Sequence, residues 1–253
     1  MSKILSIIAI IFIATTNVYA ADLTPDTDEQ ARISSLANQA ESGEQSALAA
    51  LKQAGNEGNM VAQSFLGYMY LRGQGVAKDY EEAFKWLQLA AAQEDATAQG
   101  NLASLYENGQ GVAQDYKKAL ELYSRAAGQG NAFAQTAVGE MYELGKGVEQ
   151  NHEEAVRWYV LAADQGFATA QSNLGEMYDE GKGTTKNYQE AIKWYQLAAN
   201  QNSPWAQVKL GVMYEKGKGV PKNMKLANKW YNLAAQNEDA TLIKNYRLER
   251  LKK

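Results

Sequence analysis

A 36-residue repeat constrains this chain more than any other feature of its sequence. Glutamine returns at Gln63, Gln99, Gln135, Gln171 and Gln207, each 36 residues after the one before. Tyrosines, glycine pairs, alanines and a large apolar residue keep the same step without insertion. Self-similarity at a fixed period of this length is the signature of stacked repeats, in which each unit contacts only its neighbours. The sequence predicts five repeats, at 59–95, 96–131, 132–167, 168–203 and 204–239.

Each repeat has the pattern of two helices, called helix A and helix B below. In the third repeat, apolar residues recur on one face from about Ala132 to Leu144, which predicts helix A. Gly145 follows it, because glycine adopts the left-handed conformation of a helix exit without steric cost. Helix B then carries Trp158 and Tyr159 on one face. The predicted fold class is all-α, a solenoid of antiparallel helix pairs.

Glycine also stands inside helix A, at Gly139, Gly175 and Gly211. Glycine in a helix interior costs roughly 1 kcal/mol relative to alanine. Its recurrence predicts a close approach of two helices, and we expect the helix-B tryptophans to lie over these glycines.

The two ends of the chain depart from the repeat. Residues 1–20 have a lysine, an apolar run and a small-residue cleavage pattern ending at Ala20, which predicts a secretory signal peptide. An uncleaved anchor is the alternative, but the run is shorter than the roughly 20 apolar residues that cross a bilayer. We expect a disordered leader over 21–27, a capping helix pair or degenerate repeat over 28–58, and a capping helix over 240–253. The predicted location is the periplasm, with secretion as the alternative, and no membrane insertion after cleavage.

The cysteine content and net charge of the chain limit the kinds of partner that it can bind. The chain has no cysteine, so its core has no disulfide to hold it. Its net charge is −4, and loss of Lys3 with the signal leaves 24 basic against 29 acidic residues, a net charge of −5. A mildly acidic surface argues against nucleic acid and anionic membranes as partners.

The repeat resembles the Sel1-like repeat family, relatives of the tetratricopeptide repeats. The shared unit is A-Q-x-x-L-G-x-M-Y-x-x-G-x-G-V-x-x-(D/N)-Y-x-x-A-x-x-W-Y-x-L-A-A, and Gln171 to Ala199 comes close to a full match. The resemblance covers about Asn59 to Asp239. It implies a right-handed superhelix, adaptor functions in signalling, secretion, envelope maintenance or host contact, and a concave surface lined by helix A.

The sequence contains none of the catalytic motifs of β-lactamases or serine hydrolases that such a chain could carry. The mature chain has no Ser-x-x-Lys, Lys-Thr-Gly or Gly-x-Ser-x-Gly pattern. His152 is the one histidine and occupies a slot that holds Tyr80, Tyr116 and Tyr188 elsewhere, so we interpret it as a loop anchor. We expect no catalytic residue, no metal and no cofactor. A cell-wall or β-lactam hydrolase of the cysteine-rich Sel1-like type is the disfavoured alternative.

Residues that differ from repeat to repeat are not required for the packing that the repeats share. On helix A they form a stripe at i, i+4, i+7 and i+11, opposite the core, which we call the variable stripe. Large apolar groups on a non-core stripe favour a docking surface for a protein partner, and its carboxylates favour a basic segment of that partner. The alternatives are a solvated face with scattered apolar residues, and a spacer whose length alone matters. We expect a monomer whose candidate partner-binding residues are Phe65, Tyr68, Arg72, Asn101, Phe133, Glu140, Asn173, Glu176, Glu180, Trp205 and Lys209.

Overall fold

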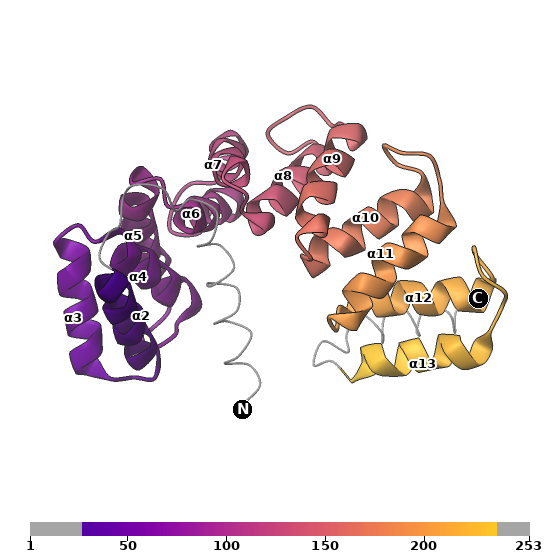
Figure 1. Ribbon diagram of the computed structural model, residues 1–253. Helices are drawn as coiled ribbons and strands as arrows, with labels where there is room; N and C mark the ends of the chain where they lie inside the picture. The colour runs from indigo at the N-terminus through magenta and orange to yellow at the C-terminus, as the bar shows by residue number, and fades with distance from the viewer. Residues whose placement is uncertain (1–26, 237–253) are drawn as a thin grey trace. The chain divides into compact units, whose positions relative to one another are not determined.

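The computed structural model describes residues 27–236, and within them it forms twelve helices and no strand (Figure 1). Internal contacts divide the chain into two compact units that meet between Asp115 and Tyr116, and each unit is described by itself. The predicted signal peptide, the leader up to residue 26 and the predicted C-terminal capping helix lie outside the described residues. Over the part that is described, the prediction of an all-α solenoid of helix pairs is confirmed; its right-handed turn stays a prediction.

The first unit contains five described helices. The first two stand where the sequence predicts a capping pair, and they pack on each other and on the helix that follows. Ile33, Leu51 and Leu66 are fully buried in the core that these three helices share. The helices are α2 (Thr27–Glu41), α3 (Gln45–Asn56), α4 (Met60–Arg72), α5 (Tyr80–Ala92) and α6 (Ala96–Asn108).

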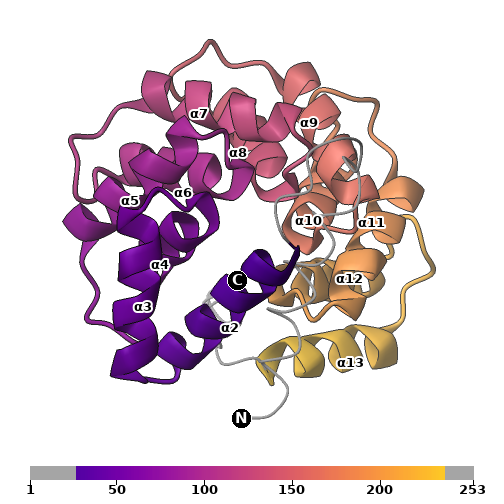
Figure 2. The ribbon, with the colours of Figure 1, turned by 60° about the vertical axis from the view of Figure 1, so that its left-hand side comes forward.

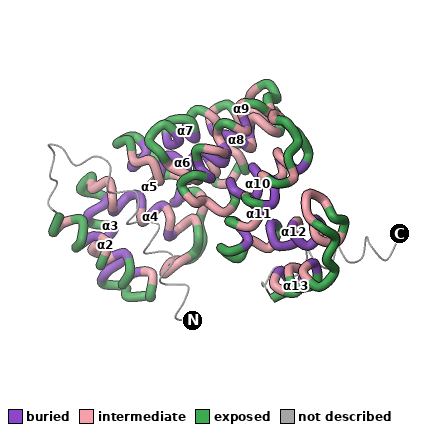
Figure 3. Tube along the Cα trace, turned by 45° about the vertical axis from the view of Figure 1, so that its right-hand side comes forward, coloured by how far each residue is buried: buried purple, intermediate pink, exposed green. Residues whose placement is uncertain are grey.

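The second unit contains seven described helices, in which helix A and helix B alternate (Figure 2). Each helix A packs most closely on the helix B that follows it, and that helix B packs on the next helix A. Buried residues accordingly gather where neighbouring helices face each other (Figure 3). The helices are α7 (Tyr116–Gly128), α8 (Ala132–Leu144), α9 (His152–Asp164), α10 (Ala168–Glu180), α11 (Tyr188–Asn200), α12 (Pro204–Lys216) and α13 (Met224–Ala235).

Local sequence signals fix where these helices begin and end. Helix α11 begins after Asn187, whose side chain accepts hydrogen bonds from the backbone N–H groups of Gln189 and Glu190 at 3.0 and 3.2 Å. Such a cap satisfies donors that the first helical turn leaves unpaired. Helix α10 ends at Gly181, which adopts a left-handed φ of 74° and donates to the carbonyl of Met177. Helix length is thus set by short-range chemistry, as the repeat pattern predicts.

The recurring glutamine has a structural cause. Gln171 is buried, and its Nε2 donates to the carbonyl of Ala163 at the end of the preceding helix B, at 3.2 Å. Its Oε1 accepts from Gln201 at 2.9 Å. Gln135 and Gln165 repeat this pair at 2.8 Å. A buried amide needs both its donor and its acceptor satisfied, and this pattern does so for Gln135 and Gln171.

The prediction that the helix-B tryptophans lie over the helix-A glycines is wrong. A Cβ placed on Gly175 would lie 2.7 Å from the ring of Tyr195, and one on Gly139 would lie 2.6 Å from the ring of Tyr159. It is therefore the tyrosine after each tryptophan that covers the glycine. Trp194 instead packs, partly buried, against a core cluster formed by α9 of the preceding repeat and α10 of its own repeat.

Candidate functional site

The structure leaves the candidate residues of the variable stripe outside the buried core, whereas Ala137, which shares the stripe position of Asn173, is buried. Seven of the candidate residues are half-buried and four are exposed. Among the exposed ones, Phe133 and Trp205 keep 42% and 38% of their surface in contact with solvent. The half-buried residues are Phe65, Tyr68, Asn101, Glu140, Asn173, Glu176 and Lys209, and the exposed ones are Arg72, Phe133, Glu180 and Trp205.

The first unit carries four of these residues on α4 and α6. Phe65 packs against the edge of the core that α2, α3 and α4 share. The guanidinium of Arg72 lies 5.7 Å from the centre of the Tyr68 ring, one turn away on the same helix. Asn101 is half-buried on α6. Two aromatic side chains and one cationic side chain thus follow one another along α4.

The second unit brings its stripe residues into contact from one helix A to the next. Asn173 on α10 donates to Glu140 on α8 at 3.1 Å. Lys209 on α12 donates to Glu176 on α10 at 2.6 Å. Both pairs join residues 33 positions apart, so they recur with the repeat. Stripe residues that the sequence suggested only as partner contacts therefore also hold adjacent repeats together.

Two stripe aromatics have defined neighbours. Phe133 meets the buried Tyr123 edge to face, with 5.9 Å between ring centres. The ammonium of Lys209 lies 4.6 Å from the centre of the Trp205 ring. The ammonium of Lys209 therefore lies between the Glu176 carboxylate and the face of the Trp205 ring. Partial shielding from water strengthens the attraction between an ammonium and an aromatic face. The side chain of Lys209 is 18% exposed and that of Glu176 is 26% exposed.

Three residues that the sequence reasoning did not select complete this surface. Asp179 on α10 binds Lys218, from the loop after α12, at 3.0 Å. The ring of Tyr195 lies beneath them on α11, fully buried. Burial, and then the charges of Glu176, Asp179 and Glu180, raise the pKa of Tyr195. One signal could have revealed the site: Asp179 occupies the repeat position that holds Glu107, Glu143 and Glu215 in three other repeats and Leu71 in the first.

Outside this surface, we find few features among the described residues that indicate a metal-binding or catalytic site. They contain no group of three or more metal-ligating side chains. The Nδ1 atom of His152 is buried without a hydrogen-bond partner in the part of the chain that the structure describes. Among residues 27–236 we find no helix with the length and apolar character needed to cross a bilayer.

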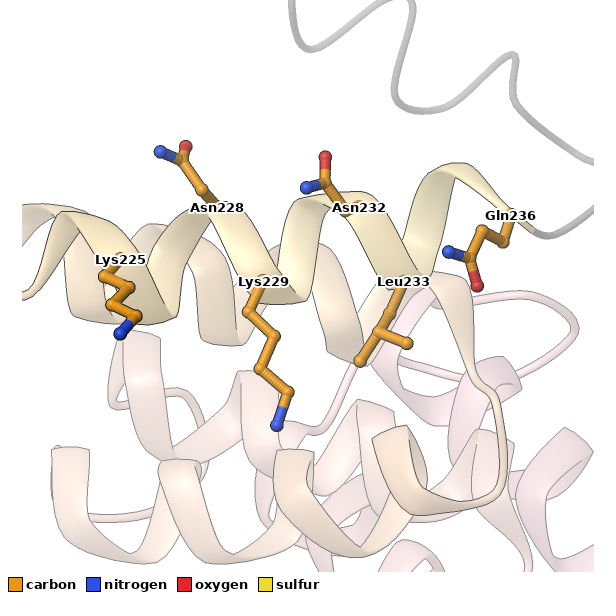
Figure 4. A pocket seen from close by; sticks show the side chains of 6 residues that line it. All are labelled: Lys225, Asn228, Lys229, Asn232, Leu233 and Gln236. Carbon is orange, nitrogen blue, oxygen red and sulfur yellow. The ribbon is translucent and has the colours of Figure 1, made fainter.

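A shallow hollow of about 610 Å³ lies on α13, away from the variable stripe. Figure 4 shows that Lys225, Lys229 and Leu233 extend from one side of this helix, with Asn228 and Asn232 on the other. This hollow contains none of the candidate residues and no acid–base pair.

Comparison with protein-family models decides the family. The model of the Sel1 repeat matches residues 61–95, 96–131, 132–167, 168–203 and 206–239, which is more than half of the chain. The chain is a Sel1-repeat protein. Proteins of this class generally mediate protein–protein interaction, and their scaffold is generally non-catalytic. No curated protein matches the chain.

Solved structures of Sel1-repeat proteins resemble this one. A Sel1-repeat protein from Oxalobacter formigenes is 32% identical with a TM-score of 0.75, over 83% of this chain and 84% of that one. A protective antigen of uropathogenic Escherichia coli with an SLR fold is 29% identical with a TM-score of 0.69, over 81% of this chain and 48% of that one. An immunity protein from Pseudomonas aeruginosa is 23% identical with a TM-score of 0.55, over 85% and 84%, and shares the fold.

Proposed function

We propose that this Sel1-repeat protein is an exported adaptor that binds a protein partner through its variable stripe. The observation that carries this proposal is the exposure of Phe133 and Trp205 on helix A, opposite a face built of small and buried residues. Exposed aromatic groups are the usual anchors of protein interfaces. An envelope regulator, a toxin-immunity protein and a factor that contacts a host all fit this role.

The charge of the stripe in the second unit favours a basic segment of the partner. Helices α8 and α10 contribute Glu140, Glu176 and Glu180 to the stripe, and neither helix contains a basic residue. Complementary charge speeds association and rejects like-charged competitors, more than it adds affinity. Raising the salt concentration is therefore expected to slow binding of the partner.

The decisive experiment compares two double variants in a pull-down from the native envelope fraction. F133A/W205A removes the exposed aromatics of helix A. L161A/L197A is the matched control, because these leucines are also exposed, at 49% and 42%, but lie on helix B. We expect the helix-A variant to lose a captured protein that both the unaltered chain and the control retain. Equal capture by all three would overturn the proposal.

The proposed location and oligomeric state have their own tests. Export with signal cleavage predicts a mature protein that begins at Ala21, which amino-terminal sequencing of the periplasmic fraction would show. Recovery of an uncleaved chain from the cytoplasm contradicts it. The proposed monomer predicts a mass near that of one chain by light scattering.

A further inference from the structure

Two repeats of the second unit share one tyrosine–carboxylate contact. The hydroxyl of Tyr159 donates to Glu143 at 2.6 Å, and the hydroxyl of Tyr231 donates to Glu215 at 2.7 Å. In each case the tyrosine lies on helix B, the glutamate lies 16 positions earlier on helix A, and the ring covers the helix-A glycine. The contact is therefore a regular element of this repeat.

The repeat between them breaks the contact. Its tyrosine, Tyr195, covers Gly175 as Tyr159 covers Gly139, so its hydroxyl points to the equivalent place. The residue 16 positions earlier is Asp179, one methylene group shorter than glutamate, and its carboxylate pairs with Lys218. The Tyr195 hydroxyl is fully buried and has no hydrogen-bond partner within residues 27–236. This is a polar group with unused capacity beside carboxylates.

The ammonium of Lys218 contacts the carboxylate of Asp179, and part of the lysine side chain stays exposed to solvent. It lies 3.0 Å from Asp179 and 5.4 Å from the Tyr188 ring, and its side chain stays 34% exposed. Lysine is a compact point charge, whereas the guanidinium of arginine is a planar fork with five donors. An arginine in this place can donate to Asp179 and to the Tyr195 oxygen together, which Lys218 does not do.

The surroundings favour a cation from outside the chain. Glu176 and Glu180 lie on the same helix as Asp179, and Glu180 has an exposed partner, Lys182, at 2.7 Å. Carboxylates, together with a hydroxyl that has no partner among the described residues, are groups to which a guanidinium can donate.

We propose that Asp179, Glu180 and Tyr195 receive an arginine side chain of the protein partner, which displaces Lys218 from Asp179. This inference rests on the proposed function, and it assigns the arginine specificity to the fourth repeat. In this proposal the arginine takes the place of the Lys218 ammonium, and the hydroxyl of Tyr195, which has no partner among the described residues, distinguishes arginine from lysine.

The test uses two capped peptides, acetyl-Gly-Arg-Gly-amide and acetyl-Gly-Lys-Gly-amide, titrated into the full chain and followed by NMR. We expect the arginine peptide to shift the signals of Asp179, Tyr195 and Lys218. One additional hydrogen bond predicts that it binds about fivefold more tightly than the lysine peptide. Equal affinity for the two peptides, or shifts elsewhere only, would overturn the inference.

Two variants leave the net charge of the site unchanged. They therefore distinguish specific recognition of arginine from general electrostatic attraction of a cation. D179E restores a carboxylate as long as Glu143, which we expect to bind the Tyr195 hydroxyl and abolish the preference for arginine. Y195F removes the hydroxyl and is expected to abolish the same preference. Y159F is the matched control, because it removes an equivalent hydroxyl that already has a partner, and it should leave the preference unchanged. A preference that survives D179E and Y195F contradicts the proposed site.

The failure of this inference differs from the failure of the proposed function. If the envelope pull-down depends on Phe133 and Trp205 but D179E captures the partner as well as the unaltered chain, the arginine site is wrong and the adaptor function stands. If the F133A/W205A variant captures the partner normally, the adaptor surface itself is wrong.

Discussion

At the scale of single residues, one methylene group changes what a repeat can do. Glu143 reaches the hydroxyl of Tyr159, whereas Asp179 binds Lys218 and the hydroxyl of Tyr195 has no acceptor in the part of the chain that the structure describes. A buried polar group without a partner costs about 1–3 kcal/mol. The array tolerates this cost in one repeat, which is the pattern expected where a site serves binding instead of stability.

Two matched substitutions measure that difference. Y159F removes a hydrogen bond of 2.6 Å and leaves the Glu143 carboxylate without its donor, so we expect it to lower the free energy of unfolding by about 1–2 kcal/mol. Y195F removes a hydroxyl that has no described partner, so we expect little loss or a small gain. Thermal melts followed by circular dichroism compare the two. An equal loss in both variants would show that the Tyr195 hydroxyl does have a partner.

The cap of α6 predicts a dependence on pH. Asp95 accepts from the backbone N–H of Ala98 at 2.6 Å and from Ser64 at 3.0 Å, but its burial raises the pKa of its carboxyl above the ordinary value. A raised pKa means that the folded chain holds this proton more tightly than the unfolded chain, so stability falls as pH rises through the ordinary aspartate range and beyond. Asparagine caps a helix about as well and carries no charge.

We therefore expect D95N to be more stable than the unaltered chain at neutral pH. The difference should shrink as the pH falls below the ordinary pKa of aspartate, where the carboxyl is protonated in both states. Melting temperatures measured across this range give the comparison. A D95N variant that is less stable at neutral pH would indicate that the favourable interaction of the charge with the helix dipole exceeds the cost of burial.

At the scale of helices, the repeat pattern made most of the fold predictable. The bounds of α8 agree with the predicted Ala132 to Leu144, because glycine exits and asparagine caps are short-range signals. The partner of the helix-A glycine was not predictable in the same way. Trp194 and Tyr195 are adjacent, and spacing alone does not say which of them meets Gly175 and which meets the preceding repeat.

The candidate site was less predictable than the helices, for a geometric reason. The variable stripe follows one helix at a time, so it identified Glu176 and Lys209 but not the ion pair that joins them across 33 positions. Lys218 lies in a loop, outside any helical stripe, and Tyr195 belongs to the core face of helix B. Contacts of this kind depend on how neighbouring repeats pack.

A pair of glycine-to-alanine changes tests the helix packing. In α10, a Cβ on Gly175 would lie 2.7 Å from the Tyr195 ring, so G175A is expected to destabilise by about 1–3 kcal/mol through overpacking. In α7, a Cβ on Gly128 would meet nothing within 4 Å, so G128A is expected to be neutral or to stabilise by up to about 1 kcal/mol through helix propensity. Chemical denaturation compares them, and a G175A variant as stable as G128A would contradict the close approach.

At the scale of the whole molecule, contacts between neighbours imply that the array can be shortened. Helices α8 and α9 form the repeat 132–167, and its removal joins Asn131 directly to Ala168. In the unaltered chain Asn131 caps α8 with its side chain, whereas Phe167, which precedes α10, provides no side-chain cap. The join therefore gives α10 a better cap, and it keeps the register because a whole period is removed.

We expect the chain without residues 132–167 to fold into a shorter array with the same fraction of helix, since stability in such arrays is a sum over repeats and their adjacent interfaces. Helices α10, α11 and α12 remain, with Asp179, Tyr195 and Lys218 in place, so the preference for the arginine peptide should persist. Circular dichroism and the peptide titration check these two expectations. A deletion variant without helical signal would contradict the nearest-neighbour origin of stability, and a folded variant without the arginine preference would show that the site needs the repeat before it.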